Sequence, residues 1–214
     1  MQGLWIQIRR LFEQLRAQGI RMTLLAAYDK LTRFITGEPV WRFSWITPNI
    51  LLGAQPARRL WPKLTKLGVT GVVNMREEFD YQKEIGGINV DYMYLPTEDN
   101  TPPTLEHLQR GAGFIKLHVD RGGKVYIHCW EGLGRGPTMV ATHFVAMGDT
   151  PDEAWGKIKA VRPFIRPTQT QRDRLAEYAK VLLAAKESAN KADAIKAGDI
   201  APENAAASTS GAAL

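Results

Sequence analysis

The only cysteine of this 214-residue chain, Cys129, lies between a short apolar run and a glycine-rich stretch. The run Lys124–Ile127 predicts a buried strand that ends at the cysteine. Three glycines between residues 132 and 136 let the backbone curl tightly enough for its N–H groups to converge. The apolar run Thr138–Met147 predicts a buried helix whose N-terminal dipole points at this loop. The pattern therefore predicts an anion-binding loop with a sulfur nucleophile at its mouth.

An arginine, Arg135, follows the cysteine by six residues. Its guanidinium offers a rigid two-pronged donor to two phosphate oxygens, which a lysine does not. Loop amides, helix dipole and guanidinium together favour the thiolate of Cys129, which can attack phosphorus to give a phosphocysteine intermediate. A buried structural cysteine beside a glycine-rich turn is the alternative. The residues expected to bind the phosphate are Trp130, Glu131, Gly132, Leu133, Gly134 and Arg135.

A thiolate displaces an alcohol slowly unless the leaving oxygen is protonated, so a carboxylic acid is needed nearby. Asp99 lies thirty residues before Cys129, in a proline-bounded loop after a predicted strand. Glu98 is the competing acid, and a local turn bond is the alternative role for Asp99. His128 is expected to hydrogen-bond under the loop rather than to act as a base. The histidines show no metal-ligand spacing, and we expect no metal and no cofactor.

The elements that must position these residues alternate along the chain. The expected strands are Phe43–Ile46, Ile50–Leu52, Val69–Met75, Ile88–Leu95 and the strand that ends at Cys129. The expected helices are Ala57–Leu67, Leu105–Val119, Pro151–Val161, Thr168–Ala185 and the helix after the loop. This alternation predicts an α/β fold with a central, largely parallel sheet flanked by helices. We divide the chain into a helical extension (1–37), the α/β domain (38–185) and a disordered tail (186–214).

Composition limits the classes of function. With 44% hydrophobic and 23% charged residues, the chain can build the core of one domain of about 150 residues. A single cysteine excludes an internal disulfide framework and fits a reducing, cytoplasmic compartment. No run of eighteen apolar residues and no signal peptide are found. The net charge of +6 suggests an anionic partner, but without a nucleic-acid-binding motif we do not expect nucleic acid.

The N-terminal extension, residues 4–35, has the pattern of a surface helix. Leu4–Ala17 carries an apolar stripe bordered by arginines, and a second helical stretch, Arg21–Ile35, follows. Such a face suits a membrane surface that carries anionic lipids, so a peripheral membrane location is expected. Packing on the domain and self-association are alternatives. The segment also faintly resembles a mitochondrial presequence, which Glu13 argues against.

Several motifs outside the cysteine loop occur in a fixed order. They are Trp45–Ala54, Asn74–Glu78, Thr97–Asp99, Pro103–Leu105, Thr138–Val140 and Ile165–Gln169. With the loop, they make the span from Trp45 to Leu182 similar to the dual-specificity branch of the protein-tyrosine phosphatases. Within that branch, the chain most resembles the mitochondrial-type phosphatidylglycerophosphate phosphatases.

The resemblance implies roles for individual residues. Cys129 would be the nucleophile, Arg135 would bind phosphate, and Asp99 would act as general acid and then as general base for water. Gln169 would position that water, although capping the following helix explains it equally well. Apart from the resemblance, Arg76 and the two glutamates after it follow a predicted strand end, where Arg76 would buttress the loop or be solvated.

The loop departs from the family at three positions. Gly136 stands where many members carry Ser or Thr, whose hydroxyl stabilises the departing thiolate; Thr138 substitutes only if the backbone brings it close. The stretch around Gly136 is similar to the regenerating-liver phosphatases, which implies slow breakdown of the phosphoenzyme. Trp130 replaces a lysine found in phosphoinositide-preferring relatives. Glu131, if it points inward, repels polyanionic substrates.

Three functions remain open. The first is a phospholipid phosphatase acting on phosphatidylglycerophosphate near a membrane. The second is a dual-specificity phosphatase acting on phosphoproteins. The third is a phosphate-binding scaffold in which Gly136 leaves the intermediate stranded.

Overall fold

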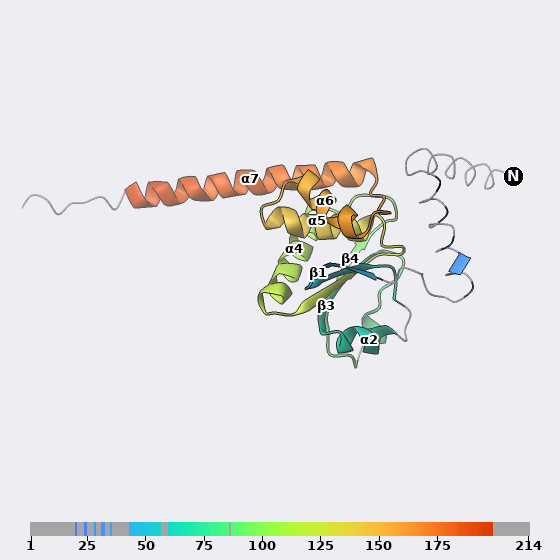
Figure 1. Ribbon diagram of the computed structural model, residues 1–214. Helices are drawn as coiled ribbons and strands as arrows, with labels where there is room; N and C mark the ends of the chain where they lie inside the picture. The colour runs from blue at the N-terminus through green and yellow to red at the C-terminus, as the bar shows by residue number, and fades with distance from the viewer. Residues whose placement is uncertain are drawn as a thin grey trace, which may run out of the picture. The chain divides into compact units, whose positions relative to one another are not determined.

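The computed structural model describes residues 43–56, 60–85 and 87–198, together with six single residues between 20 and 35. Five strands form one sheet in the order β1-β2-β5-β3-β4 (Figure 1). They are β1 (Phe43–Thr47), β2 (Ile50–Gly53), β3 (Val69–Arg76), β4 (Asp91–Thr97) and β5 (Lys124–His128). Strand β1 pairs antiparallel with β2, and the other three pairings are parallel. The expected largely parallel sheet is confirmed.

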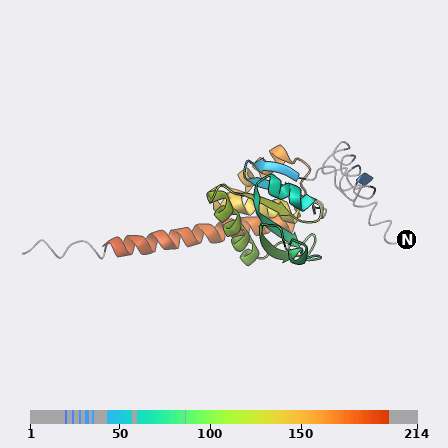
Figure 2. The ribbon, with the colours of Figure 1, turned by 90° about the horizontal axis from the view of Figure 1, so that it is seen from below.

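Helices lie on both faces of the sheet (Figures 1 and 2). They are α2 (Trp61–Lys66), α3 (Gln82–Ile85), α4 (Leu105–Asp120), α5 (Arg135–Ala146), α6 (Pro151–Val161) and α7 (Gln169–Gly198). Helices α4, α5 and α6 contact the sheet on one side, and α2 contacts β3 on the other. Because both faces are covered, the central strand β5 is a buried run instead of an alternating one.

Local signals fix where these helices begin. Thr104 accepts a hydrogen bond from the backbone of His107 and caps α4. Thr150 and Glu153 form a capping box at the start of α6, with Pro151 in the first turn. On the other side of the sheet, a core cluster that includes Trp61 and Tyr126 anchors α2.

Several elements differ from the sequence expectations. Helix α2 covers Trp61–Lys66 where Ala57–Leu67 was expected, and residues 57–59 lie outside the described ones. Helix α5 begins at Arg135 and not at Thr138, so the loop runs directly into its N-terminus. Strand β4 continues past Pro96 to Thr97, which an edge strand tolerates because its outer N–H groups have no ladder partner. Helix α3 was not expected. Helix α7 reaches Gly198, where a disordered tail was expected from residue 186, because alanine, lysine and glutamate favour helix.

The N-terminal extension falls largely outside the described residues, as do residues 199–214. The expected helices Leu4–Ala17 and Arg21–Ile35 therefore remain predictions. Five of the six described residues there are large hydrophobics, all helical and more than half exposed: Ile20, Leu24, Tyr28, Leu31 and Ile35. Among the helices of the described residues, none is long and apolar enough to cross a membrane.

Candidate active site

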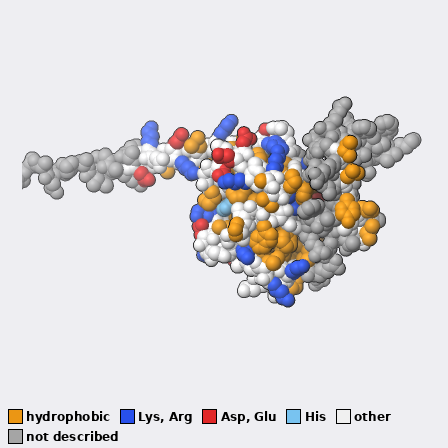
Figure 3. Space-filling view, viewed as in Figure 1, with side chains coloured by type: hydrophobic (Ala, Val, Ile, Leu, Met, Phe, Trp, Pro, Cys, Tyr) orange, Lys and Arg blue, Asp and Glu red, His pale blue; other side chains and the backbone are white. Residues whose placement is uncertain are grey.

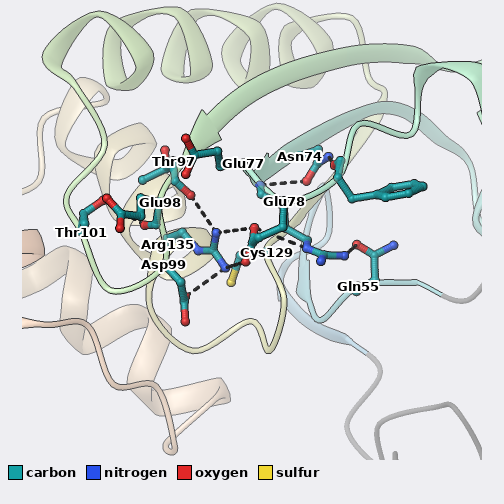
Figure 4. Close-up of polar contacts among 12 residues, drawn as sticks. Gln55, Asn74, Glu77, Glu78, Thr97, Glu98, Asp99, Thr101, Cys129 and Arg135 are labelled. Atoms are coloured by element: carbon teal, nitrogen blue, oxygen red, sulfur yellow. Dashed lines mark hydrogen bonds and ion pairs between the residues drawn. The ribbon is translucent and has the colours of Figure 1, made fainter.

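Three parallel strands bring the predicted catalytic residues Cys129 and Asp99 together with Glu78, for which no catalytic role was predicted. Cys129 directly follows β5, Glu78 lies two residues beyond β3, and Asp99 lies two residues beyond β4. Because the strands are parallel, their carboxyl ends meet at one edge of the sheet, where α/β folds bind ligands. Figure 4 shows these side chains converging on Arg135.

The loop after Cys129 turns its carbonyl groups outward. Each of the four carbonyls from residues 130 to 133 accepts a hydrogen bond from a group outside the loop. These four hydrogen bonds run from Gln55 N to Trp130 O (3.1 Å), from Arg162 Nη2 to Glu131 O (3.3 Å), from Arg162 Nε to Gly132 O (3.1 Å) and from Arg166 N to Leu133 O (2.6 Å). In a trans peptide the N–H points opposite to the C=O. The amides of residues 131–134 therefore face inward and form the predicted anion nest.

Gly132 has two functions in this nest. Its backbone N–H donates to Cys129 Sγ at 3.2 Å, which holds the sulfur against the loop. Its φ is +70°, and a Cβ at this position would lie 2.5 Å from the carbonyl oxygen of Gly53. The loop therefore requires glycine here.

Arg135 is 1% exposed and is held by acceptors from two strand ends. Its Nη1 donates to Glu78 Oε2 (2.9 Å) and to Thr97 O (2.7 Å). Its Nη2 donates to Glu78 Oε1 (3.1 Å) and pairs with Asp99 Oδ1 (2.9 Å). Of the three guanidinium nitrogens of Arg135, Nε is the one that has no hydrogen-bond acceptor among the described residues. Nε therefore remains available for a phosphate oxygen.

Glu78 is the residue whose role in the site the sequence left undecided. Burial alone would raise the pKa of its carboxyl, but the hydrogen bond and charge of Arg135 bring that pKa below its usual value. Burial would likewise lower the pKa of Arg135, but Glu78, Cys129 and Asp99 raise it. Both partners therefore carry full charge at neutral pH.

Arg76 buttresses the loop, which was one of its two expected roles. Its guanidinium carbon lies 4.4 Å from the centre of the Trp130 ring, a cation–π contact. It also donates to Gln55 Oε1 at 3.1 Å, and Gln55 itself binds the carbonyl of Trp130. The side chain of Trp130 is 43% exposed, so it forms part of the rim.

Glu131 points toward Arg166, with which it forms an ion pair at 3.5 Å. This ion pair offsets the negative charge that Glu131 brings to the loop.

The three supporting residues lie in different surroundings. His128 is fully buried against the rings of Trp61, Tyr81 and Tyr126, and burial lowers its pKa to about 3. A neutral, enclosed ring does not fit the role of a base, and within the described residues neither ring nitrogen has a hydrogen-bond partner, so the expected hydrogen-bonding role is not confirmed. The Thr138 hydroxyl donates to Gly134 O at 2.9 Å, one turn back in its own helix. Its proton is therefore not directed at the sulfur.

Gln169 is not directed at the site. It is exposed, and its amide donates to Asp173 Oδ1 at 2.8 Å. The glutamine next to the loop is Gln171, which is 1% exposed and was not predicted. Its amide oxygen accepts from Thr168 N, so Gln171 also has the capping role considered for Gln169.

Comparison with known proteins assigns the fold and the loop to a family. Residues 50–181 match the dual specificity phosphatase catalytic domain. The chain belongs to this family. The phosphatase is 35% identical to the human phosphatidylglycerophosphatase and protein-tyrosine phosphatase 1 over 148 residues, 65% of this chain and 74% of the human one. It is 28% identical to the Arabidopsis thaliana phosphatidylglycerophosphate phosphatase PTPMT1 over 144 residues, 64% of this chain and 43% of that one.

Solved structures agree with the sequence relatives. A crystal structure of PTPMT1 in complex with PI(5)P has a TM-score of 0.64 and 29% identity, and covers 68% of this chain and 99% of that one. The crystal structure of Tk-PTP in its active form has a TM-score of 0.59 and 28% identity, and covers 66% of this chain and 98% of that one. The resemblance drawn from the motifs is therefore confirmed, and the protein is a cysteine-based phosphatase.

Proposed function

We propose that Cys129, Arg135 and Asp99 hydrolyse a phosphomonoester in two steps. In the first, the Cys129 thiolate attacks phosphorus, the S–P bond forms, and the bond from phosphorus to the leaving oxygen breaks. Asp99 gives its proton to that oxygen. In the second, water attacks phosphorus, Asp99 takes the water proton, and the thiolate leaves. The observation that carries this proposal is the convergence of thiolate, guanidinium and carboxylate at the ends of three parallel strands.

Asp99 changes partner during the first step. A phosphate bound by two arginine donors needs Nε and one N–H of Nη2, and Asp99 occupies that Nη2 position at 2.9 Å. Phosphate binding therefore displaces the Asp99 carboxyl from the guanidinium. Because the Asp99 side chain is 60% exposed, it can rotate toward the leaving oxygen without rearranging the core.

We propose a phospholipid substrate, phosphatidylglycerophosphate. The support is that the human and the plant relatives, which align with the region holding the site, carry that activity in their names. The human name also includes protein-tyrosine phosphatase, so a phosphoprotein is the second candidate.

The substrate proposal is tested by assaying phosphatidylglycerophosphate, a phosphoinositide and a phosphotyrosine peptide side by side in the presence of a metal chelator. We expect the highest kcat/KM for phosphatidylglycerophosphate, with Cys129→Ser inactive on all three. A higher kcat/KM for the peptide would favour the protein substrate. Negligible turnover on all three with a stable phosphoenzyme would favour the scaffold.

We further propose that residues 4–35 hold the enzyme at an anionic membrane surface. The described residues Ile20, Leu24, Tyr28, Leu31 and Ile35 support this, because their spacing puts exposed hydrophobic side chains on one helical face. On the domain face seen in Figure 3, Lys and Arg side chains stand among acidic and hydrophobic ones and form no single basic patch. Because of these exposed hydrophobic side chains we assign membrane attachment to the extension, with the enzyme peripheral in the cytoplasm; a mitochondrial location is the alternative.

Deleting Met1–Gly37 tests the attachment. The truncated protein should lose binding to vesicles that contain phosphatidylglycerol and keep its activity on a small soluble aryl phosphate. Unchanged vesicle binding would exclude the extension as the anchor.

A further inference from the structure

The turn that carries Asp99 has little packing of its own. Thr101 N donates to Glu98 O at 3.2 Å, which closes a β-turn, and Asn100 adopts the left-handed conformation at φ +64°. Glu98, Asp99 and Asn100 are all exposed. Something outside the turn must therefore keep Asp99 near Arg135.

The start of α7 supplies that attachment. The buried Gln171 donates from Nε2 to Thr101 O at 2.9 Å, across 70 residues of sequence. Thr168 Oγ1 donates to Asn100 O at 3.4 Å, a weaker contact with the same turn. The two contacts fasten the acid turn at its third and fourth residues.

The same amide lies against the phosphate loop. A Cβ on Gly134 would lie 3.0 Å from Gln171 Oε1 and 3.5 Å from Nε2. Gly134 precedes Arg135 and caps α5. The carboxamide therefore lies between the loop that holds the phosphate and the turn that carries the acid.

We propose that Gln171 is a positioning residue that holds the acid turn in place, so that only the Asp99 side chain moves during the reaction. This inference rests on the proposed role of Asp99 as the general acid. If Gln171 acts through Asp99, its loss should slow the expulsion of poor leaving groups and spare good ones, because only poor leaving groups need the proton.

The substitution Gln171→Glu separates this function from helix capping. A glutamate keeps the oxygen that accepts from Thr168 N, and it is a standard partner in a capping box. At neutral pH the carboxylate cannot donate to Thr101 O and repels it. Gln169→Ala is the matched control, because Gln169 lies in the same turn of α7 but is exposed and bonded to Asp173.

The experiment measures kcat/KM for an alkyl phosphate and for p-nitrophenyl phosphate in four proteins: wild type, Gln171→Glu, Asp99→Ala and the double variant. Asp99→Ala should lower the alkyl value by about 100-fold, the scale of general acid catalysis. Gln171→Glu should lower it by about tenfold, because a misplaced acid still helps part of the time. In both single variants, kcat/KM for p-nitrophenyl phosphate should change little. In the Asp99→Ala background, Gln171→Glu should have no further effect on the alkyl value. Gln169→Ala, measured alongside, should match the wild type.

Several results would overturn the proposal. They are an unchanged alkyl value in Gln171→Glu, an equal loss on both substrates, the same loss in Gln169→Ala, or additive losses in the double variant. If Asp99→Ala lowers kcat/KM equally for both substrates, the assignment of Asp99 as the acid in the proposed function fails as well. The Asp99→Ala data alone are enough to recognise that failure. Gln171→Ala, which also removes the cap, provides a second measurement should the glutamate variant fold poorly.

Discussion

Arg135 has five N–H donors, of which three make hydrogen bonds to Glu78 and Thr97, while Asp99 forms an ion pair with Nη2. Glu78 takes two in a bidentate pair, which fixes the plane of the guanidinium. Nε has no acceptor among the described residues, so it and the Nη2 donor that Asp99 gives up are left for the proposed phosphate. Glu78 thus orients the phosphate-binding group without contacting the phosphate itself.

Glu78→Gln should therefore lower kcat/KM on every phosphomonoester, by about 10- to 100-fold, because a neutral amide neither matches the guanidinium fork nor balances its charge. The loss should be the same for aryl and alkyl leaving groups, unlike the loss in Asp99→Ala. Steady-state assays on both substrates measure this. The neighbouring Glu77→Gln serves as the control, since it makes the same change in charge one residue away from the carboxylate that binds Arg135. A leaving-group-dependent loss in Glu78→Gln would contradict a role through Arg135.

Gly136 offers a second test at single-residue scale. A Cβ there would lie 3.6 Å from Cys129 N and 3.0 Å from the tip of Leu52, so a small side chain fits beside the cysteine with slight adjustment. The Thr138 hydroxyl is committed to Gly134 O and does not replace the missing group. Gly136→Ser should therefore speed breakdown of the phosphoenzyme by about tenfold or more, since a hydroxyl can stabilise the departing thiolate.

Single-turnover kinetics would measure that step, and Gly136→Ala separates the hydroxyl from the added volume. Equal rates in Gly136→Ser and Gly136→Ala would show that the hydroxyl is not what limits breakdown.

The phosphate loop, as an element, is shaped from behind by Arg162. This arginine is 1% exposed and donates to the carbonyls of Glu131 and Gly132 and to Ser44 Oγ. A lysine has a single ammonium and cannot span these acceptors. Arg162→Lys should cost about 2 kcal/mol of stability and weaken inhibition by vanadate, because the amides of the nest lose their alignment. Denaturant unfolding and inhibition titrations check both, with the partly exposed Arg174→Lys as control. Wild-type vanadate inhibition in Arg162→Lys would contradict this role.

Sequence predicts the loop well and its supports poorly, for a physical reason. Cys129, the glycines and Arg135 act through local backbone geometry, so their spacing alone indicates the nest. Arg162 and Gln171 act on partners 30 or more residues away, and nothing in their own surroundings marks them. Gln169 was predicted in place of Gln171 because the exact start of α7 decides which of the two glutamines faces the core. The sequence alone does not show that start.

At the scale of the whole molecule, His128 makes the free energy of unfolding depend on pH. Its pKa is about 6.5 in an unfolded chain and about 3 when buried, so between these values the unfolded state binds more protons. This contribution to stability is fully present above pH 6.5 and is lost as the pH falls toward 3, at about 1.4 kcal/mol per pH unit. His128→Phe, which keeps an aromatic ring against Tyr126, should reduce that slope. Denaturant unfolding at several pH values between 4 and 7 measures it, and an unchanged slope would contradict the assignment.

The central claim for the whole enzyme is that the reaction passes through phosphate bound to Cys129. The most direct measurement is the intact mass of the full-length protein, quenched in acid during turnover of an aryl phosphate. We predict a species heavier by one phosphoryl group in the wild type, more of it in Asp99→Ala, and none in Cys129→Ser, which should also be inactive. Phosphate release that continues in Cys129→Ser would contradict the account.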